Sequence, residues 1–235
     1  RGSGCRCHFT RPCLPATVAV GFDRLARPYR LLERAVFGDR LQRARCAHME
    51  SFLEAKQILL LGEGDGRFLE ALLAEGCRAE IVCLDASIGM LDLAEERAGE
   101  KGSGVRFLAG DVRNLRLPQE FRPDVVSAHF FLDCFREEEL LDIVESIACG
   151  SIPGGKVVVT DFKLPEGGWV WRLRGRLLIF LMLLFFRVFA GISARKLPDL
   201  CHLLTKQGWN CRKEAIFDNG LVFSRVMELP ANKRS

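Results

Sequence analysis

The chain has 235 residues, of which 49% are apolar and 27% charged, and its formal net charge is +4. This composition supports a sizeable buried core and excludes an intrinsically disordered chain. The positive surplus is small and no block of Lys and Arg is interleaved with aromatic residues, so we expect no nucleic-acid partner.

The ten cysteines are scattered along the chain, most of them within apolar or helical stretches. We therefore expect reduced, buried thiols and a cytoplasmic protein. The exception is a group of potential metal ligands within the first 16 residues: Cys5, Cys7, His8 and Cys13. Their spacing lacks the paired pattern of a zinc module, which favours an irregular N-terminal extension over a metal site.

Apolar residues recur at helical spacing from about Val18 to Glu54, which predicts a helical N-terminal segment over residues 17–55. Strands and helices are then expected to alternate. Helices are predicted over residues 67–76, 87–102 and 137–150. Ser87 is the expected N-cap of the second helix. Strands are predicted over residues 57–61, 80–85, 105–111, 123–131 and 156–162.

These strands are almost continuous apolar runs, as expected for strands that are buried on both faces. Near the end of the chain a helix is predicted over 196–209, and Asn219-Gly220 between two apolar runs predicts a β-hairpin. The pattern therefore predicts an α/β, doubly wound, Rossmann-like domain. We expect a seven-stranded sheet that is mostly parallel and ends in an antiparallel hairpin.

Three glycines, Gly62, Gly64 and Gly66, stand where the first strand becomes a helix. Glycine permits a tight turn there and lets a ligand approach the backbone. The following helix offers unpaired N–H groups at the carboxyl edge of the sheet, where open α/β folds bind ligands. The alternative is a tight turn that binds nothing.

Carboxylates end the next two strands. Asp85 is suited to accept both hydroxyls of a ribose, and Asp111, after Gly110, to accept the amino group of an adenine. The alternative for each is that it caps the following turn or helix. Glu63 and Asp65 within the loop would repel a pyrophosphate and suit a ligand with positive charge.

The stretches "LLLGEGDGRFLEALL", "IVCLDASIGML", "VRFLAGDV" and "SIPGGKVVVTDF" occur in this order. Together they resemble the class I S-adenosylmethionine-dependent methyltransferases, in particular the small-molecule branch, over roughly residues 20–228. The resemblance implies S-adenosylmethionine as cofactor. It also implies that residues 17–55 form a helical lid that carries Tyr29, the single tyrosine, and that residues 56–235 form the cofactor-binding domain.

The same resemblance assigns individual cofactor contacts. The loop would pass beneath the methionine part, Asp85 would hold the ribose, and Asp111 with Val112 would hold the adenine. His129 would line the methyl-transfer site. The full set of implied cofactor-binding residues is Tyr29, Gly62, Glu63, Gly64, Gly66, Asp85, Ala86, Ser87, Met90, Asp111, Val112 and His129.

Methyl transfer needs correct placement of donor and acceptor, and a general base only where the acceptor must lose a proton. His129 is the best candidate base, with Asp133 and Asp161 behind it. The alternatives are a core histidine at 129 and a turn cap at 133. The sequence shows no paired carboxylates, and no set of metal ligands appears in the core motifs.

The segment 169–192 is intensely apolar and includes the unbroken run "LLIFLMLLFF". That run is too short for a transmembrane helix, which needs about 20 residues. We expect an apolar helical insertion over 169–195 that contacts an apolar acceptor, a membrane surface or a second copy of the chain. Four arginines within it are placed to snorkel or to meet lipid phosphates: Arg172, Arg174, Arg176 and Arg187.

The sequence therefore predicts methyl transfer to the oxygen, nitrogen or carbon of a small, apolar acceptor, such as a quinone, an isoprenoid or a lipid-like molecule. One alternative is a nicotinamide-dependent oxidoreductase, which the G-E-G-D-G loop and the closing hairpin fit poorly. The other is a non-catalytic binding or scaffolding protein on the same fold.

Overall fold

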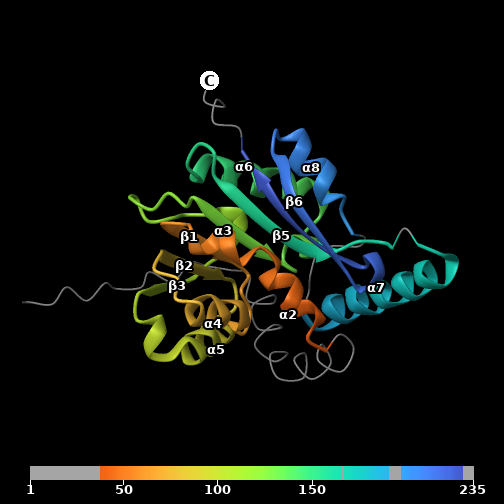
Figure 1. The fold of residues 1–235 in the computed structure, drawn as a ribbon, viewed down its shortest axis with the longest axis horizontal. Helices are drawn as coiled ribbons and strands as arrows, with labels where there is room; N and C mark the ends of the chain where they lie inside the picture. Colours follow the sequence, from red (N-terminus) through yellow and green to blue (C-terminus); the bar gives the residue numbers. More distant parts are fainter. Residues whose placement is uncertain (1–37, 166, 191–196, 230–235) are drawn as a thin grey trace, which may run out of the picture.

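The computed structural model describes residues 38–165, 167–190 and 197–229 of the chain (Figure 1). Tyr29 and the N-terminal group of cysteines lie outside the described residues. The predicted boundaries of the extension, the lid and the cofactor-binding domain therefore stay predictions.

The seven strands form one sheet in the order β3-β2-β1-β4-β5-β7-β6. The five parallel strands are β1 (Gln57–Leu61), β2 (Glu80–Asp85), β3 (Val105–Ala109), β4 (Val125–His129) and β5 (Lys156–Phe162). β7 (Val222–Glu228) runs antiparallel between β5 and β6 (Asn210–Phe217). The predicted Rossmann-like sheet with its closing hairpin is confirmed.

Two apolar clusters cover the two faces of this sheet. Successive side chains of a strand point to opposite faces, so Ile58 and Leu60 join one cluster, while Leu59 and Leu61 join the other. The first cluster packs beneath α4 (Arg67–Ala74) and α5 (Ile88–Ala98). The second packs beneath α6 (Glu137–Gly150) and α8 (Leu200–Lys206), which lie across the sheet from α4 and α5 (Figure 1).

From residue 38 onward, where the description begins, three short helices precede β1 in a stretch that was expected to be one helical segment: α2 (Arg40–Arg45), η1 (Cys46–His48) and α3 (Met49–Leu53). The Gln42 side chain donates a 3.0 Å hydrogen bond to the carbonyl of Arg67, so α2 is fixed to the start of α4. Arg40 pairs with Asp218 at 2.9 Å in the turn between β6 and β7. α2 is thereby held near the carboxyl ends of the parallel strands.

Short 3-10 helices connect several of these elements. η2 (Gly99–Gly102) replaces the last turn of the helix predicted over 87–102, and η5 (Asp218–Gly220) forms the predicted hairpin turn. η3 (Val112–Asn114) follows β3, and η4 (Leu132–Cys134) follows β4. β3 and β4 each end two residues earlier than predicted. β4 stops at His129 because the next residue, Phe130, has a φ of 52° and leaves the extended conformation.

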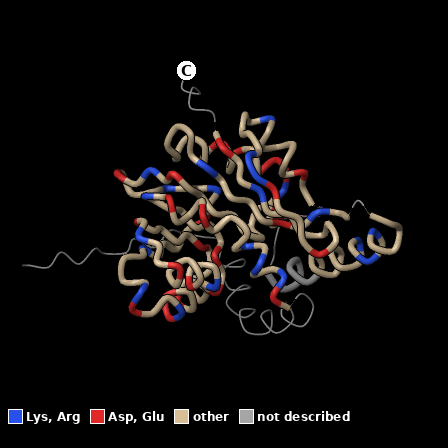
Figure 2. Tube along the Cα trace, viewed as in Figure 1, with Lys and Arg blue, Asp and Glu red and all other residues tan. Residues whose placement is uncertain are grey.

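α7 (Trp169–Ala190) extends from one end of the molecule (Figure 1). It packs through Ile179 and Leu183 on a third apolar cluster that includes Leu41 of α2 and Phe162 of β5. Acidic and basic residues are both scattered along most of the described trace (Figure 2). Within the described residues, no helix is both long enough and apolar enough to cross a bilayer.

Candidate functional site

The three glycines of the first strand-to-helix loop all have positive φ: 59° at Gly62, 67° at Gly64 and 80° at Gly66. A Cβ on Gly62 would lie 2.1 Å from the ring of Phe131, and one on Gly66 would lie 2.6 Å from the backbone of Ala94. Packing inside the protein therefore explains those two. Around Gly64, however, no described atom lies within 4 Å of the Cβ position. Its open face is where a ligand can approach the backbone.

Asp85 connects this loop to the next one. One carboxylate oxygen accepts a 3.3 Å hydrogen bond from the Gly64 N–H, and the other accepts a 2.9 Å bond from the Ser87 N–H. The Ser87 hydroxyl accepts a 3.1 Å bond from the Met90 N–H, which confirms Ser87 as the N-cap of α5. Hydrogen bonds thus join Gly64 to Asp85, Asp85 to Ser87, and Ser87 to Met90. That these residues and Ala86 contact a cofactor stays a prediction.

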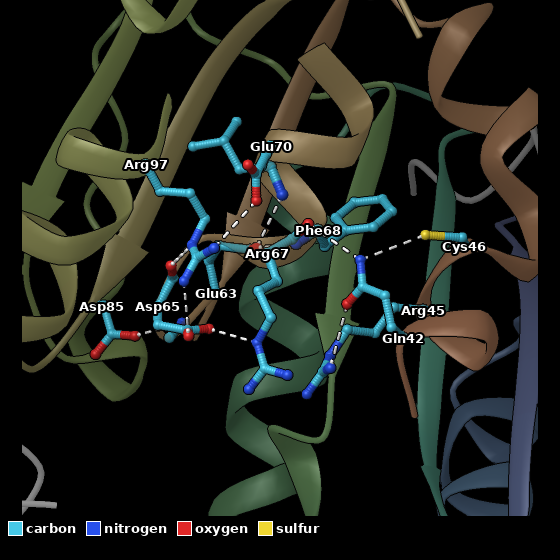
Figure 3. A network of polar contacts seen from close by, with 12 residues as sticks. Gln42, Arg45, Cys46, Glu63, Asp65, Arg67, Phe68, Glu70, Asp85 and Arg97 are labelled. Atoms are coloured by element: carbon cyan, nitrogen blue, oxygen red, sulfur yellow. Dashed lines mark hydrogen bonds and ion pairs between the residues drawn. The ribbon is translucent and has the colours of Figure 1, made fainter. Parts of the chain in front are cut away.

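Glu63 and Asp65, which are expected to suit a ligand with positive charge, both contact other residues of the protein (Figure 3). The Glu63 carboxylate accepts 2.9 Å hydrogen bonds from the N–H groups of Phe68 and Leu69 in the first turn of α4. Asp65 pairs with Arg67 at 3.0 Å and with Arg97 at 3.3 Å. Two of the N–H groups at the start of α4 that could bind a pyrophosphate are therefore already occupied.

The Glu63 carboxyl has an unusual proton affinity. Burial raises its pKa to about 7, although the two backbone hydrogen bonds and the nearby Arg45 act in the opposite direction. The charge of this loop therefore changes near neutral pH. A ligand with positive charge would favour the ionised form.

Asp111 caps η3, as the alternative interpretation held. It accepts a 2.9 Å hydrogen bond from the Arg113 N–H, and both of its oxygens also contact the Arg113 side chain. Burial acts to raise the pKa of Asp111, but the hydrogen bonds and charge of Arg113 lower it overall. The Gly110 N–H donates to the carbonyl of Asp85 at 2.9 Å, so Asp111 and Val112 lie at the same edge as Asp85. An adenine contact stays a prediction.

His129 ends β4 and is only 6% exposed. Its ring makes edge contacts with Phe68 and Phe52, at centroid distances of 4.5 and 6.0 Å. Neither ring nitrogen has a hydrogen-bond partner among the described residues. Burial lowers the pKa of His129 to about 3, so the imidazole is neutral and a weak proton acceptor. This environment disfavours its predicted role as general base.

The structure brings together a pair of carboxylates that the sequence analysis did not recognise as a pair. Asp133 and Asp161 are both buried, and the Asp133 N–H donates to the Asp161 carboxylate at 3.2 Å. The Phe162 N–H donates to the other oxygen of Asp161 at 2.8 Å. Burial raises the pKa of both carboxyls, and the Asp133 charge raises that of Asp161 further. The pair therefore retains a proton more readily than isolated carboxyls.

A signal for this pair was available in the sequence. β4 and β5 are parallel neighbours, with His129 opposite Thr160. Asp161 directly follows Thr160, and Asp133 lies four residues beyond His129, so both come to the same edge. The alternative interpretation made Asp133 a cap of the turn that leads to α6. Asp133 lies within that turn, in η4, and the N-cap position of α6 belongs to Arg136.

Two aromatic residues complete the site. Phe130 has a φ of 52°, which is uncommon for a bulky side chain, and the guanidinium of Arg45 lies 5.0 Å from its ring centre. Phe131 packs on Gly62. Strained backbone of this kind is often found at functional sites. The sequence signal was the pair of aromatics directly after a buried strand.

Comparison with known proteins matches residues 58–155 to a family model described as a methyltransferase domain. The chain is 32% identical over 149 residues to a demethylmenaquinone methyltransferase of Thermus thermophilus, covering 63% of this chain and 66% of that protein. It is 30% identical over 151 residues to the Deinococcus radiodurans protein of the same name, covering 63% and 61%. The chain thus spans a little under two thirds of the length of these relatives.

Solved structures share the fold. An O-methyltransferase family protein from Burkholderia thailandensis has a TM-score of 0.65 at 15% identity, covering 90% of this chain and 59% of that one. N-methyltransferase NodS from Bradyrhizobium japonicum, in complex with S-adenosyl-L-homocysteine, has a TM-score of 0.63 at 14% identity, covering 91% and 99%. Sequence motifs, family model and fold agree: residues 58–155 match a methyltransferase domain, and the chain is similar to methyltransferases in sequence and in fold.

Proposed function

We propose that this protein binds S-adenosylmethionine and transfers its methyl group to a small, apolar acceptor. The observation that carries the proposal is the open face of Gly64, whose N–H is held by Asp85 while Glu63 occupies the N-terminus of α4. The loop thus leaves space for a ligand, while the Glu63 carboxylate occupies two N–H groups that a pyrophosphate could otherwise use. This arrangement disfavours a nicotinamide dinucleotide and fits a ligand without phosphates.

S-adenosylmethionine supplies a methyl group bound to a positively charged sulfur. In the proposed complex, the methionine part lies over Gly64 and the Asp85 carboxylate accepts hydrogen bonds from the ribose hydroxyls, for which its remaining lone pairs are suited. Met90 and Val112 provide apolar surface on the adenosine side. The main task of these residues is to place the donor, because correct placement supplies much of the acceleration in a bimolecular reaction.

For the acceptor, we propose an apolar molecule of the quinol type. Two features support this choice. The relatives from Thermus and Deinococcus are named as demethylmenaquinone methyltransferases, and Phe130 and Phe131 offer aromatic surface beside the glycine loop. A phenolic hydroxyl loses its proton more easily than an alcohol, so such an acceptor would not need the weakly basic His129 as a general base.

Calorimetric titration with S-adenosylhomocysteine tests the cofactor assignment, with NADH as the control ligand. We expect micromolar binding of the first and none of the second. Asp85→Asn should weaken binding at least tenfold, since the neutral amide is a poorer acceptor. Asp92→Asn, on the exposed side of α5, should not change it. Absence of S-adenosylhomocysteine binding to the folded protein would refute the proposal.

A second experiment separates an enzyme from a binding or scaffolding protein. S-adenosylmethionine with a labelled methyl group is incubated with the protein and a panel of hydroquinones, phenols and amines. Transfer to an organic-extractable hydroquinone product, reduced in Asp85→Asn, is the expected result. Cofactor binding without transfer to any member of the panel would argue against the proposed acceptor class.

A further inference from the structure

α7 has an unusual distribution of apolar side chains. Its inner side is buried through Ile179 and Leu183, as in other helices. Its outer side, however, also consists of large apolar residues, each between 46% and 76% exposed: Trp169, Val170, Leu173, Leu177, Phe180, Leu181 and Leu184. A surface helix of a globular protein ordinarily has polar residues on that side. We call these seven residues the apolar stripe.

The positions of the arginines relative to the stripe follow from helix geometry. At roughly 100° per residue, the stripe occupies an arc of about 120° on the helix. Arg176 and Arg172 border one edge of this arc and Arg174 borders the other. Long basic side chains at both edges can extend sideways while the stripe between them enters an apolar phase. This is the layout of a helix that lies in the plane of a membrane surface.

The charge of α7 also supports binding to a membrane surface. The sequence from Trp169 to Ala190 contains four arginines and no Asp, Glu or Lys. Arg174 pairs with Asp218 at 3.6 Å, whereas Arg172 and Arg176 form no ion pair within the described part of the chain. α7 shows blue positions separated by tan in Figure 2, in contrast to the mixed charges elsewhere. Unpaired cations beside an apolar stripe complement the phosphates of anionic lipids.

From the stripe and its borders we infer that α7 docks this protein on the surface of an anionic lipid bilayer. The apolar stripe enters the boundary between headgroups and acyl chains, and Arg172 and Arg176 contact lipid phosphates. Trp169 and Trp171, at the first turn, are the residue type that favours this boundary. The inference goes beyond the proposed methyl transfer and does not depend on it.

A second copy of the chain is a less suitable occupant. In a symmetric dimer the same surface is present on both sides of the interface. Because α7 has arginines at both edges of the stripe and no acidic residue, a helix-to-helix dimer would bring like charges together. A bilayer with anionic headgroups has the opposite charge at the same height as the arginines.

One set of ion pairs connects α7 to the helix beside the candidate site. Asp218 pairs with Arg174 of α7 and with Arg40 of α2. α2 in turn carries Gln42, which donates to the carbonyl of Arg67 at the start of α4 (Figure 3). It also carries Arg45, whose guanidinium lies 5.0 Å from the centre of the Phe130 ring. If the proposed acceptor class is correct, the bilayer is the phase in which such a molecule dissolves, and the docked helix lies beside it.

Vesicle co-sedimentation of the full chain tests the inference, with phosphatidylcholine vesicles that contain or lack phosphatidylglycerol. We expect binding to the anionic vesicles that weakens with salt. Phe180→Glu should weaken vesicle binding more than tenfold, because a charge replaces a large ring that would be buried in the bilayer. Arg172→Gln and Arg176→Gln should each weaken it about fivefold. Leu141→Glu and Arg78→Gln are the matched controls, since both residues are exposed and lie outside α7, in α6 and before β2. Both variants should bind vesicles as the parent protein does.

Tryptophan fluorescence gives a second readout that locates the contact. The three tryptophans are Trp169 and Trp171 in α7 and Trp209, which is fully buried. On addition of anionic vesicles, emission should shift to shorter wavelength and be quenched by brominated lipids, and Trp169→Phe should reduce both effects. Thermal unfolding confirms that each variant is folded.

Three results would overturn the inference. The first is a folded protein that does not bind anionic vesicles. The second is vesicle binding that Phe180→Glu and the arginine variants leave unchanged. The third is a dimer, measured by analytical ultracentrifugation, that Phe180→Glu dissociates while vesicle binding is absent, which would assign the stripe to a second copy.

Discussion

The backbone N–H of Gly64 donates a 3.3 Å hydrogen bond to the carboxylate of Asp85. This contact joins the turn after β1 to the turn after β2, so the two parts of the proposed cofactor site are held together before a ligand arrives. A loop that already has its bound shape loses less conformational entropy on binding. A test of ligand contact at Gly64 can therefore be separated from a test of loop stability.

Gly64→Ala should reduce S-adenosylhomocysteine affinity at least tenfold, because the added methyl group fills the open space over the loop. Its positive φ alone should lower the free energy of unfolding by about 1 kcal/mol. Gly76→Ala is the matched control, since Gly76 has a φ of 81° and also has no described atom near its Cβ position, but lies at the end of α4. Calorimetry should show normal affinity for Gly76→Ala. Equal loss in both variants would mean that backbone strain, not ligand contact, explains Gly64.

Arg97 should be a positioning residue for the glycine loop. Its guanidinium donates to the Asp65 carbonyl at 2.8 Å and pairs with the carboxylates of Asp65 and Glu70. Arg97→Met keeps much of the side-chain volume and removes these contacts, so we expect a three- to tenfold loss of cofactor affinity, equivalent to about 1 kcal/mol. Arg106→Gln, which breaks an exposed ion pair with Glu80, should have no effect on titrations. Unchanged affinity in Arg97→Met would show that the loop holds its shape without it.

Glu63 should make cofactor discrimination depend on pH. Its pKa of about 7 means that the carboxylate becomes negative between about pH 6 and 8, and the sulfonium of S-adenosylmethionine carries a positive charge that S-adenosylhomocysteine lacks. The affinity ratio of the two ligands should therefore shift toward S-adenosylmethionine by several-fold as pH rises, an effect of about 1 kcal/mol. Glu63→Gln should abolish the shift, and Glu95→Gln on the exposed side of α5 should retain it.

The same carboxyl predicts a pH effect on stability. Because its folded-state pKa is raised, the folded protein holds a proton that the unfolded chain has lost, so this group costs stability as pH rises from about 4.5 to 7. In urea unfolding, Glu63→Gln should gain stability relative to the parent protein over that window. A difference that does not change with pH would contradict the raised pKa.

Much of the sheet could be predicted from the sequence because its strands are short apolar runs between helices with clear caps. The helix 137–150 and the strand 156–162 were predicted with the bounds that the structure shows. β3 and β4 were predicted too long, since apolar side chains continue past the point where Phe130 leaves the extended conformation. Periodicity reports burial, and burial continues beyond the end of a strand.

Parts of the candidate site could be predicted where a residue type in a given position usually has one structural role. They could not be predicted where the role of a residue depends on which side chain or backbone group it contacts. Three alternate glycines and a carboxylate after the next strand indicate a ligand loop, and Gly64 and Asp85 do lie together. The capping of α4 by Glu63 depends on a side chain turning inward, which no spacing reports. The pairing of Asp133 with Asp161 depends on the neighbouring positions of β4 and β5, which only topology provides.

His129→Leu tests whether the buried imidazole contributes to methyl transfer. Since neither ring nitrogen has a described partner, its loss should change the free energy of unfolding by less than about 1 kcal/mol. We expect the transfer rate to fall at least tenfold with normal S-adenosylhomocysteine affinity, as for a residue that borders the acceptor. At saturating S-adenosylmethionine, where the effect of Glu63 on affinity does not limit the rate, the parent enzyme should show no rate change that titrates near pH 6.5, because the pKa of His129 is about 3. A limb near 6.5 that disappears in the variant would establish a general base instead.

Asp161→Asn tests the buried carboxylate pair. Burial and the neighbouring Asp133 raise the pKa of Asp161, so the folded protein keeps a proton that the unfolded chain loses above about pH 4. The pair therefore costs stability as pH rises toward neutrality and costs nothing below the unfolded pKa. In urea unfolding at a series of pH values, Asp161→Asn should gain stability relative to the parent protein as pH increases from about 4. Asp133→Asn should show the same trend, because either amide removes the repulsion between the two carboxylates. A stability difference independent of pH in both variants would show that neither pKa is raised in the folded protein.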